Sequence, residues 1–334
     1  MSYYLMLIFG FALLVGGGES LVRGSVAIAE RLGLSPLLIG LVLVGFATST
    51  PELVTSVEAA LAGSPGIAVG NIVGSNISNI LFVLGVSAII APIAVNPNAF
   101  GRDGVLVFLA AILFTAIGFY LPLDRAVGFG LVTGLFVYLC YAYRQEMAKN
   151  LPAHTAACEK MKAYEELHGG SGQPQVTTGP LSKEQGVFMA ILLTGGGLLI
   201  LVAGGNLLVA GAIGIARVAG ISETVIGLSI VAIGTSLPEL ATSVIAALRK
   251  HGDVALGNVL GSSLYNILGV GGMTAILSPT FIPPHIARFD NFVMVASAAV
   301  LLLFAAMGRR IGRAQGAALL ASYGAYLCII WPAS

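Results

Sequence analysis

Long apolar stretches, separated by short polar connections, make up almost the whole chain of 334 residues. Each stretch is about 20 residues or longer, which is the length an α-helix needs to cross the hydrocarbon core of a bilayer. The pattern therefore predicts an all-α polytopic membrane protein with ten transmembrane helices. Their approximate limits are 3–31, 36–62, 65–91, 99–121, 126–143, 185–217, 223–248, 253–278, 287–307 and 314–332.

The composition agrees with a chain that lies mostly in a lipid bilayer. Hydrophobic residues make up 57% of the sequence and charged residues 9%, whereas a soluble domain usually carries about 25% charged residues. The formal net charge of +1 provides no basic surface for nucleic acid. No basic residue precedes Arg23, so we interpret the first stretch as a span and not as a cleaved signal peptide. Cys140, Cys158 and Cys328 lack CxxC spacing, which indicates neither a disulfide framework nor a metal centre.

A polar region at about 147–184 divides the chain and contains the turn-rich run GGSGQPQVTTGP, which is typical of a flexible linker. We therefore predict a first five-helix unit at 1–146, a linker at 147–184 and a second five-helix unit at 185–334. Lys and Arg are concentrated in one set of connections, thirteen against three, and this set is expected to face the cytoplasm. The linker is then cytoplasmic, and both termini lie on the extracellular or periplasmic side of the cell membrane.

The two units carry the same sequence motifs. FATSTPELVTSVEAAL, from Phe46, matches IGTSLPELATSVIAAL, from Ile233, and GNIVGSNISNIL, from Gly70, matches GNVLGSSLYNIL, from Gly257. The offset is 187 residues in both pairs. An internal repeat of this kind decides the architecture of the whole chain.

The two repeats are expected to have opposite orientations in the membrane. The second span of the first repeat ends in the uncharged turn AGSPG, whereas its counterpart ends in Arg249, Lys250 and His251. An odd number of spans in each unit has the same consequence. Inverted repeats build many secondary transporters, with the ion site at the midplane where the repeats meet. The alternative is a duplicated scaffold that transports nothing.

Each repeat places one glutamate, Glu52 or Glu239, near the middle of its second span, with no cationic residue nearby in sequence. An ionisable group there is costly and marks a functional site by default, although a polar contact between helices is the alternative. Pro51 and Pro238 directly precede the glutamates. Because proline removes a backbone donor and disfavours helical geometry before it, we expect broken helices, with residues 48–49 and 235–236 unwound.

The third span of each repeat supplies further oxygen atoms. Ser75 and Asn79 in the first repeat match Ser262 and Asn266 in the second, and a spacing of four places each pair on one helix face. Interhelical hydrogen bonding and ion ligation both fit these residues. The neighbouring glycines favour close helix packing. The side chains of the candidate site are Glu52, Glu239, Thr48, Ser49, Thr235, Ser236, Ser75, Ser262, Asn79 and Asn266.

All of these donors are hard oxygen ligands. Ca²⁺ takes six to eight such oxygens in a flexible cage, whereas Mg²⁺ is held reluctantly by protein atoms alone. The absence of Cys and His from the set argues against zinc and copper. Two carboxylates are balanced by one Ca²⁺, two Na⁺ or two protons, and competition between these ions is a natural basis for exchange.

At these residues the chain resembles the cation/calcium exchanger superfamily, whose two repeats carry G-T-S-x-P-E and G-N-x-x-G-S-N motifs. The second repeat contains the first motif intact from Gly234 to Glu239, and the first repeat has Ala47 in place of its glycine. The resemblance extends over essentially the whole chain. It implies a fold of ten helices, with the ten side chains above as ion ligands, in an antiporter like the prokaryotic sodium/calcium exchangers. It implies no organic cofactor and no enzymatic activity.

The coupling ion expected from this resemblance is Na⁺. Sodium/calcium exchangers often have an aspartate at the position of Asn266, and the amide here argues against potassium dependence. The proton/calcium branch tends to carry asparagine-bearing motifs in place of T-S-x-P-E. A Ca²⁺/H⁺ antiporter is the alternative within transport, and an intramembrane enzyme that uses the paired glutamates as acid and base is the alternative from another class.

Three further charged residues of the apolar stretches lie outside the candidate site. Glu58 occurs only in the first repeat and is either solvated or attracts entering cations. Glu19 and Arg23 are four residues apart, so they are expected to pair across one helical turn in a structural role.

Overall fold

The computed structural model describes residues 3–32, 36–61, 63, 65–95, 97–145, 183–218, 232–307 and 310–330. Most of the predicted linker, the start of the predicted span at 223–248 and both chain ends lie outside these residues.

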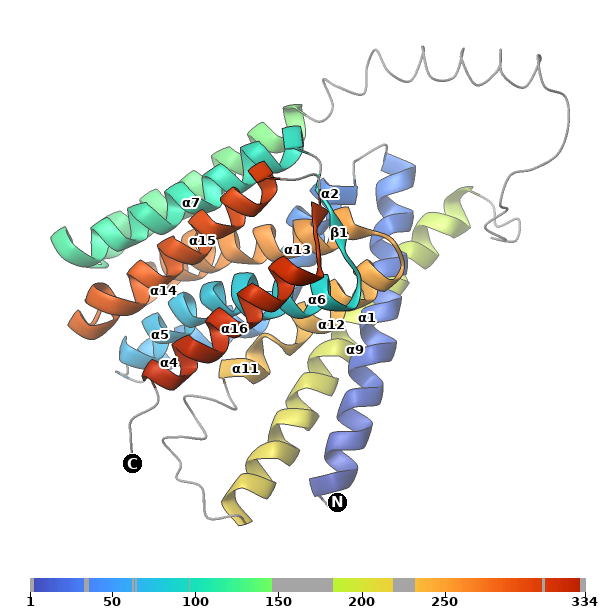
Figure 1. The fold of residues 1–334 in the computed structure, drawn as a ribbon, viewed down its shortest axis with the longest axis horizontal. Coiled ribbons are helices and arrows are strands. Elements are labelled where there is room, and N and C mark those ends of the chain that lie inside the picture. Colours follow the sequence, from blue (N-terminus) through green and yellow to red (C-terminus); the bar gives the residue numbers. More distant parts are fainter. Residues whose placement is uncertain are drawn as a thin grey trace, which may run out of the picture.

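The described residues are mostly helical, and two short strands, β1 and β2, pair at one edge of the bundle (Figure 1). Proline begins several helices, as at Pro65 and Pro97, where its missing N–H group costs no helical hydrogen bond. In the first half the elements are α1 (Tyr3–Leu32), α2 (Pro36–Ile39), the π-helical segment η1 (Gly40–Val44), α3 (Gly45–Thr48), α4 (Thr50–Leu61), α5 (Pro65–Ile77), the π-helical segment η2 (Ser78–Val83), α6 (Leu84–Ile90), β1 (Ile93–Ala94), α7 (Pro97–Tyr120) and the helical span Arg125–Gln145.

The second half has a similar succession of helices, although β2 follows α15 whereas β1 precedes α7. Its π-helical segment η4 begins 187 residues after η2, at the offset of the sequence repeat. The elements are α9 (Lys183–Val218), α11 (Ala232–Thr235), α12 (Leu237–Leu248), α13 (Gly252–Leu264), η4 (Tyr265–Val270), α14 (Gly271–Leu277), the π-helical segment η5 (Ile286–Asp290), α15 (Asn291–Met307), β2 (Arg310–Ile311) and α16 (Arg313–Ile330).

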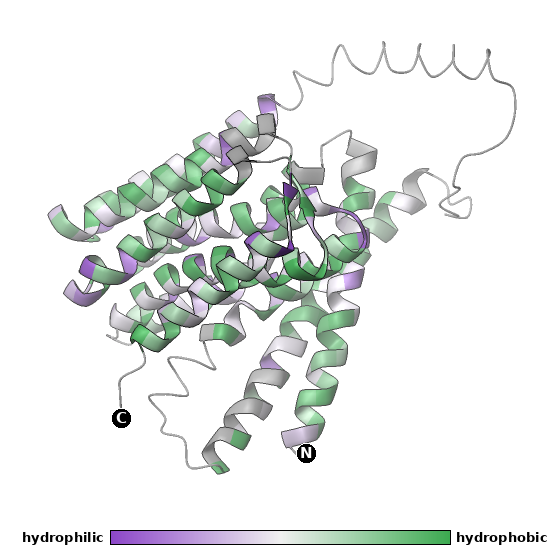
Figure 2. Cartoon of the chain, in the orientation of Figure 1, coloured by the Kyte–Doolittle hydropathy of each residue, from purple (hydrophilic) through white to green (hydrophobic). Residues whose placement is uncertain are grey.

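Seven helices of the described part are long and apolar enough to cross a membrane, and an eighth span is formed if the bent pair Gly40–Thr48 and Thr50–Leu61 is counted as one. That pair bends by 43°. Hydrophobic residues predominate along α1, α7 and α15 (Figure 2). The side chains of Phe11, Phe136 and Leu199 are more than 60% exposed, as suits surfaces that face lipid. The all-helical membrane architecture is confirmed, and the number of ten spans stays a prediction.

α1 and α9 form an antiparallel pair that crosses the other helices at a steep angle (Figure 1). Glycine allows their backbones to approach closely, as in many membrane helix pairs. A Cβ atom at Gly17 would lie 2.7 Å from the backbone nitrogen of Leu201, and one at Gly197 would lie 2.6 Å from that of Leu21. The two helices are therefore packed as one unit along their length.

The second and third spans of the two halves interlock at the centre of the bundle. α4 packs on α5 and α12 packs on α13, while α3 crosses to α13 and α12 crosses to α6 and η2. A Cβ atom at Gly261 would lie 2.3 Å from the carbonyl oxygen of Leu41, so the predicted close packing at this glycine is observed. At Gly74, its counterpart, no described atom lies within 4 Å of the added Cβ. The stretch equivalent to 36–44 is 223–231, which lies outside the described residues.

Contacts between the halves occur in matching pairs. Arg125 donates from Nε to the carbonyl oxygen of Ile276 at 3.3 Å, and Arg313 donates to that of Ile89 at 3.1 Å. Arginine thus satisfies carbonyl groups at the end of a helix in the opposite half. The backbone pairing of Ile93 with Ile311 is likewise matched by the bridge between residues 123 and 280. The last helix of each half therefore lies against the third span of the other.

Candidate ion-binding site

Glu52 and Glu239 lie in the first turns of α4 and α12, and both side chains are fully buried. Each helix begins directly after a single residue that leaves helical geometry. Ser49 has φ −82° and ψ 2°, and Ser236 has φ −87° and ψ 3°. The breaks therefore place one carboxyl group from each half in the interior of the bundle.

The breaks are shorter than the sequence predicts. Thr48 still belongs to α3, and the helical hydrogen bonds continue around Ser49, from its N–H group to the carbonyl of Gly45 and from Leu53 to its own carbonyl, both at 3.1 Å. The prediction of two unwound residues in each break was thus wrong for Thr48 and for Thr235, which is the last residue of α11. The physical reason is the position of Pro51 in the first turn of α4, where its N–H group would have no helical partner in any case.

Hydrogen bonds join the first break to the second half. The hydroxyl oxygens of Thr48 and Ser262 are 3.2 Å apart, and the Ser49 hydroxyl donates to Oε1 of Glu239 at 3.5 Å. Ser262 also donates to the carbonyl oxygen of Gly45 at 3.3 Å. Four of the ten predicted side chains are thereby brought into direct contact across the two halves.

Asn79 and Asn266 each occupy the second position of a π-helical segment, in η2 and η4. Such segments occur frequently at functional sites because they interrupt the regular helical ladder. α12, which carries Glu239, packs on η2, and α4, which carries Glu52, packs on η4. Each glutamate-bearing helix therefore contacts the asparagine-bearing segment of the opposite half.

Several polar atoms of this region are buried without a hydrogen-bond partner among the described residues. They include both carboxyl oxygens of Glu52, Oε2 of Glu239, the hydroxyl of Ser236 and the side-chain amides of Asn79 and Asn266. An unsatisfied buried polar group costs about 1–3 kcal/mol and calls for a specific explanation. Carboxylate, hydroxyl and amide oxygens are the ligand types that Ca²⁺ and Na⁺ take, so the donor set fits a transported hard cation.

Ser75 and Thr235 complete the predicted set. Ser75 is buried on α5, four residues before Asn79, and Thr235 is the last residue of α11, directly before the second break. Both therefore lie on the elements that form the site. The side chain of Glu58 is outside the described part of the chain.

Two asparagines that the sequence analysis did not select support the glutamates. Asn71 donates to the backbone carbonyl of Glu52 at 3.2 Å and to the Ser56 hydroxyl at 2.9 Å. Asn258 makes the equivalent hydrogen bonds to Glu239 at 3.2 Å and Ser243 at 2.9 Å. The sequence feature that identifies these two residues is the asparagine that directly follows the first glycine of the G-N-x-x-G motif in both repeats.

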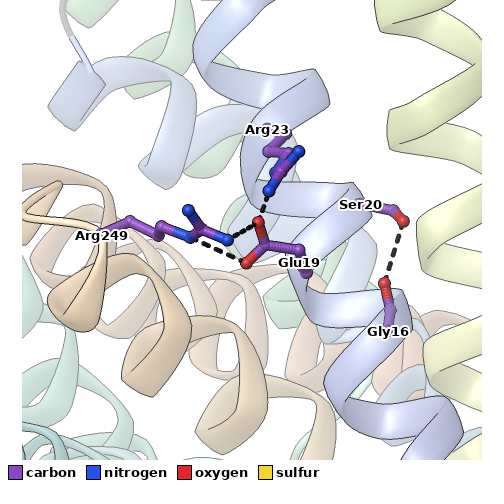
Figure 3. A network of polar contacts seen from close by, with 5 residues as sticks. All are labelled: Gly16, Glu19, Ser20, Arg23 and Arg249. Carbon is purple, nitrogen blue, oxygen red and sulfur yellow. Dashed lines mark hydrogen bonds and ion pairs between the residues drawn. The ribbon is translucent and has the colours of Figure 1, made fainter.

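The predicted pairing of Glu19 with Arg23 is observed on α1 (Figure 3). Glu19 also pairs with Arg249, which follows the end of α12 and donates from Nε to Oε2 at 3.0 Å. The second pairing was not predicted, because 230 residues separate its partners. It joins α1 to the helix that carries Glu239.

A family model described as sodium/calcium exchanger protein matches residues 2–144 and again residues 189–331. The chain is 32% identical over 346 residues to the sodium/calcium exchanger MaX1 of Methanosarcina acetivorans, with 98% of each chain covered. It is 30% identical over 298 residues to the inner membrane protein YrbG of Escherichia coli, and the aligned region covers 89% of this chain and 87% of the relative.

Solved structures of the sodium-calcium exchanger NCX_Mj have the same fold. One of them, obtained after soaking with Na⁺ and Sr²⁺, is 31% identical to this chain and superimposes with a TM-score of 0.80. The match covers 98% of this chain and 97% of the solved one. The similarity therefore extends over the two halves and the site between them.

Proposed function

The chain belongs to the sodium/calcium exchanger family and is a membrane cation/calcium antiporter, not an enzyme, and from this premise we propose that it exchanges Ca²⁺ for Na⁺ at the two buried glutamates. The observation that carries the proposal is the pair formed by Glu52 and Glu239, fully buried on helices of opposite halves with carboxyl oxygens that lack protein partners. Two such charges in the interior require compensation by bound cations or by protons.

The proposed ligands are the two carboxylates and the neutral oxygens around them. Ser49 of the first half donates to Glu239, Ser262 contacts Thr48, and the partnerless amides of Asn79 and Asn266 provide two further carbonyl oxygens. One Ca²⁺ neutralises both carboxylates, and so do two Na⁺ ions, so the same charges serve either cargo in turn. The full proposed set is Glu52, Glu239, Thr48, Ser49, Thr235, Ser236, Ser75, Ser262, Asn79 and Asn266.

Na⁺ is the proposed coupling ion because the neutral donors of the site are hydroxyls and amides, which ligate alkali cations and do not titrate near neutral pH. Relatives named as sodium/calcium exchangers also support Na⁺. The alternative is exchange of Ca²⁺ for protons at the same two carboxylates.

Alternating access is proposed to arise from movement of α1 and α9 against the remaining helices. Close glycine contacts favour movement of this pair as one body, and α1 lies along α12 next to the site. A Cβ atom at Gly18 would lie 2.7 Å from the end of the Ile245 side chain. Sliding of α1 on this surface would open the site to one side of the membrane and then to the other.

The topology is proposed to be that of two inverted five-helix repeats, at 1–146 and 185–334, joined by a cytoplasmic linker at 147–184. Both termini then lie outside the cytoplasm. The matching contacts between the halves and the double match to one family model support the repeat.

Flux measurements in proteoliposomes test the coupling ion. Vesicles loaded with Na⁺ and diluted into Na⁺-free medium should take up ⁴⁵Ca²⁺, whereas a pH gradient of either sign without Na⁺ should not drive uptake. Uptake driven only by the pH gradient would contradict Na⁺ coupling and support the Ca²⁺/H⁺ alternative.

A further inference from the structure

Asn71 and Asn258 occupy equivalent places in the two halves and make equivalent contacts. Each amide nitrogen reaches two acceptors on the neighbouring helix: the backbone carbonyl of the glutamate and the hydroxyl of the serine four residues later. Residues four apart lie one above the other on a helix face. Each asparagine therefore spans one complete turn of the helix that carries the glutamate.

We propose that Asn71 and Asn258 are positioning residues that set the Ca²⁺ affinity of the site by fixing the first turns of α4 and α12 on α5 and α13. This inference rests on the proposed function. Neither amide reaches a carboxyl group in the described contacts, so both asparagines act through the backbone of Glu52 and Glu239.

The first turn of each helix needs such a restraint because of the break before it. Pro51 and Pro238 provide no N–H group, and Ser49 and Ser236 leave helical geometry. Backbone hydrogen bonds continue across the first break, but the helix direction changes there by 43°, so the preceding helix does not hold the first turn of α4 in line. A hydrogen bond from the adjacent helix to the glutamate carbonyl fixes this turn from the side.

Asn258 has a further contact that reaches the other half. Its side-chain oxygen accepts a hydrogen bond from the Thr48 hydroxyl at 3.2 Å. The Thr48 hydroxyl also lies 3.4 Å from the carbonyl oxygen of Gly45 and 3.2 Å from the Ser262 hydroxyl. Asn258 thereby contacts one proposed ligand, Thr48, while it holds the helix of another, Glu239.

The test measures Ca²⁺ uptake driven by a Na⁺ gradient in proteoliposomes, as half-saturating Ca²⁺ concentration and maximal rate, for Asn71→Leu and Asn258→Leu. Leucine keeps a similar volume and adds no charge. The control is Thr115→Val. Thr115 is buried on α7, and its hydroxyl donates to the carbonyl of Ala111 within its own helix at 2.8 Å, so this variant loses a buried hydrogen bond that lies within one helix.

Loss of the positioning contacts should raise the half-saturating Ca²⁺ concentration about 10-fold in both variants, in line with one or two lost hydrogen bonds. The maximal rate per folded protein should stay within about twofold of the wild-type rate. In the control variant, both the half-saturating concentration and the maximal rate should stay within about twofold of the wild-type values. A purely structural role would instead lower the amount of active protein and leave the half-saturating concentration unchanged. That last result would overturn the inference.

Ser56→Ala and Ser243→Ala provide a second route if a leucine variant does not fold. Each removes one acceptor of the amide and leaves the asparagine in place, and each should raise the half-saturating concentration about threefold. No increase in either variant would overturn the inference. Failure of the proposed function is distinguishable, because it would appear in the wild-type protein as a lack of Na⁺-driven Ca²⁺ uptake.

Discussion

The Ser49 hydroxyl donates to Oε1 of Glu239 across 3.5 Å and so joins the helix break of one half to the carboxyl group of the other. The distance is long for a hydrogen bond between hydroxyl and carboxylate, whose usual value is about 2.5–3.0 Å. The two groups are close enough to ligate one cation together. Because they belong to opposite halves, any change in the relative position of the halves alters this pair directly.

Ser49→Ala should therefore weaken Ca²⁺ binding without loss of folding. Removal of one proposed neutral oxygen ligand that also contacts Glu239 is expected to raise the half-saturating Ca²⁺ concentration for Na⁺-driven uptake about 10-fold. Ser20→Ala is the control, because the Ser20 hydroxyl donates to the carbonyl of Gly16 within α1 (Figure 3). Equal Ca²⁺ affinities in the two variants would show that the Ser49 hydroxyl is no ligand.

Gly261→Ala should destabilise the interlocked core. The added Cβ would lie 2.3 Å from the carbonyl oxygen of Leu41, a backbone atom that can give way only if a helix shifts. We expect a loss of about 1–3 kcal/mol, as for other overpacked cores, seen as a lower melting temperature of the purified protein in detergent. Gly324→Ala, where the described residues leave the Cβ without a neighbour within 4 Å, should melt like the wild type. Equal melting of both variants would contradict the packing described here.

A reversible link between residues 19 and 249 tests the proposed movement of α1. Glu19→Cys and Arg249→Cys are combined in a background without Cys140, Cys158 and Cys328, and a reducible bifunctional thiol reagent joins them. Because the native ion pair connects α1 to the end of α12, the link should stop Ca²⁺ uptake, and reduction should restore it.

The single-cysteine variants, treated with the same reagent, should continue to transport and thereby control for modification alone. Full uptake by the linked protein would contradict movement of α1 against α12.

The positions of the candidate site residues along the helices could be predicted from the sequence because they depend on short motifs. The glutamates, the break before each of them and the oxygen donors on the third spans could all be read from T-S-x-P-E and G-N-x-x-G-S-N. The helical architecture followed from hydropathy, since a bilayer-spanning backbone must satisfy its hydrogen bonds internally.

Relationships between distant residues were not predictable in the same way. The contacts of Ser49 with Glu239 and of Glu19 with Arg249 span 190 and 230 residues, and no local pattern specifies them. The extent of the break was overestimated, because proline in a first turn costs less than proline within a helix. The roles of Asn71 and Asn258 depend on contacts with a backbone carbonyl, which sequence does not reveal.

Equilibrium binding of ⁴⁵Ca²⁺ to the purified protein tests most directly whether the two glutamates hold calcium together. Wild-type protein should bind Ca²⁺ at a site from which increasing Na⁺ displaces it. Glu52→Gln and Glu239→Gln, which keep the shape of the side chain and remove its charge, should each abolish this binding, while Glu19→Gln should retain it. Full, Na⁺-sensitive Ca²⁺ binding in both glutamate variants would contradict the account.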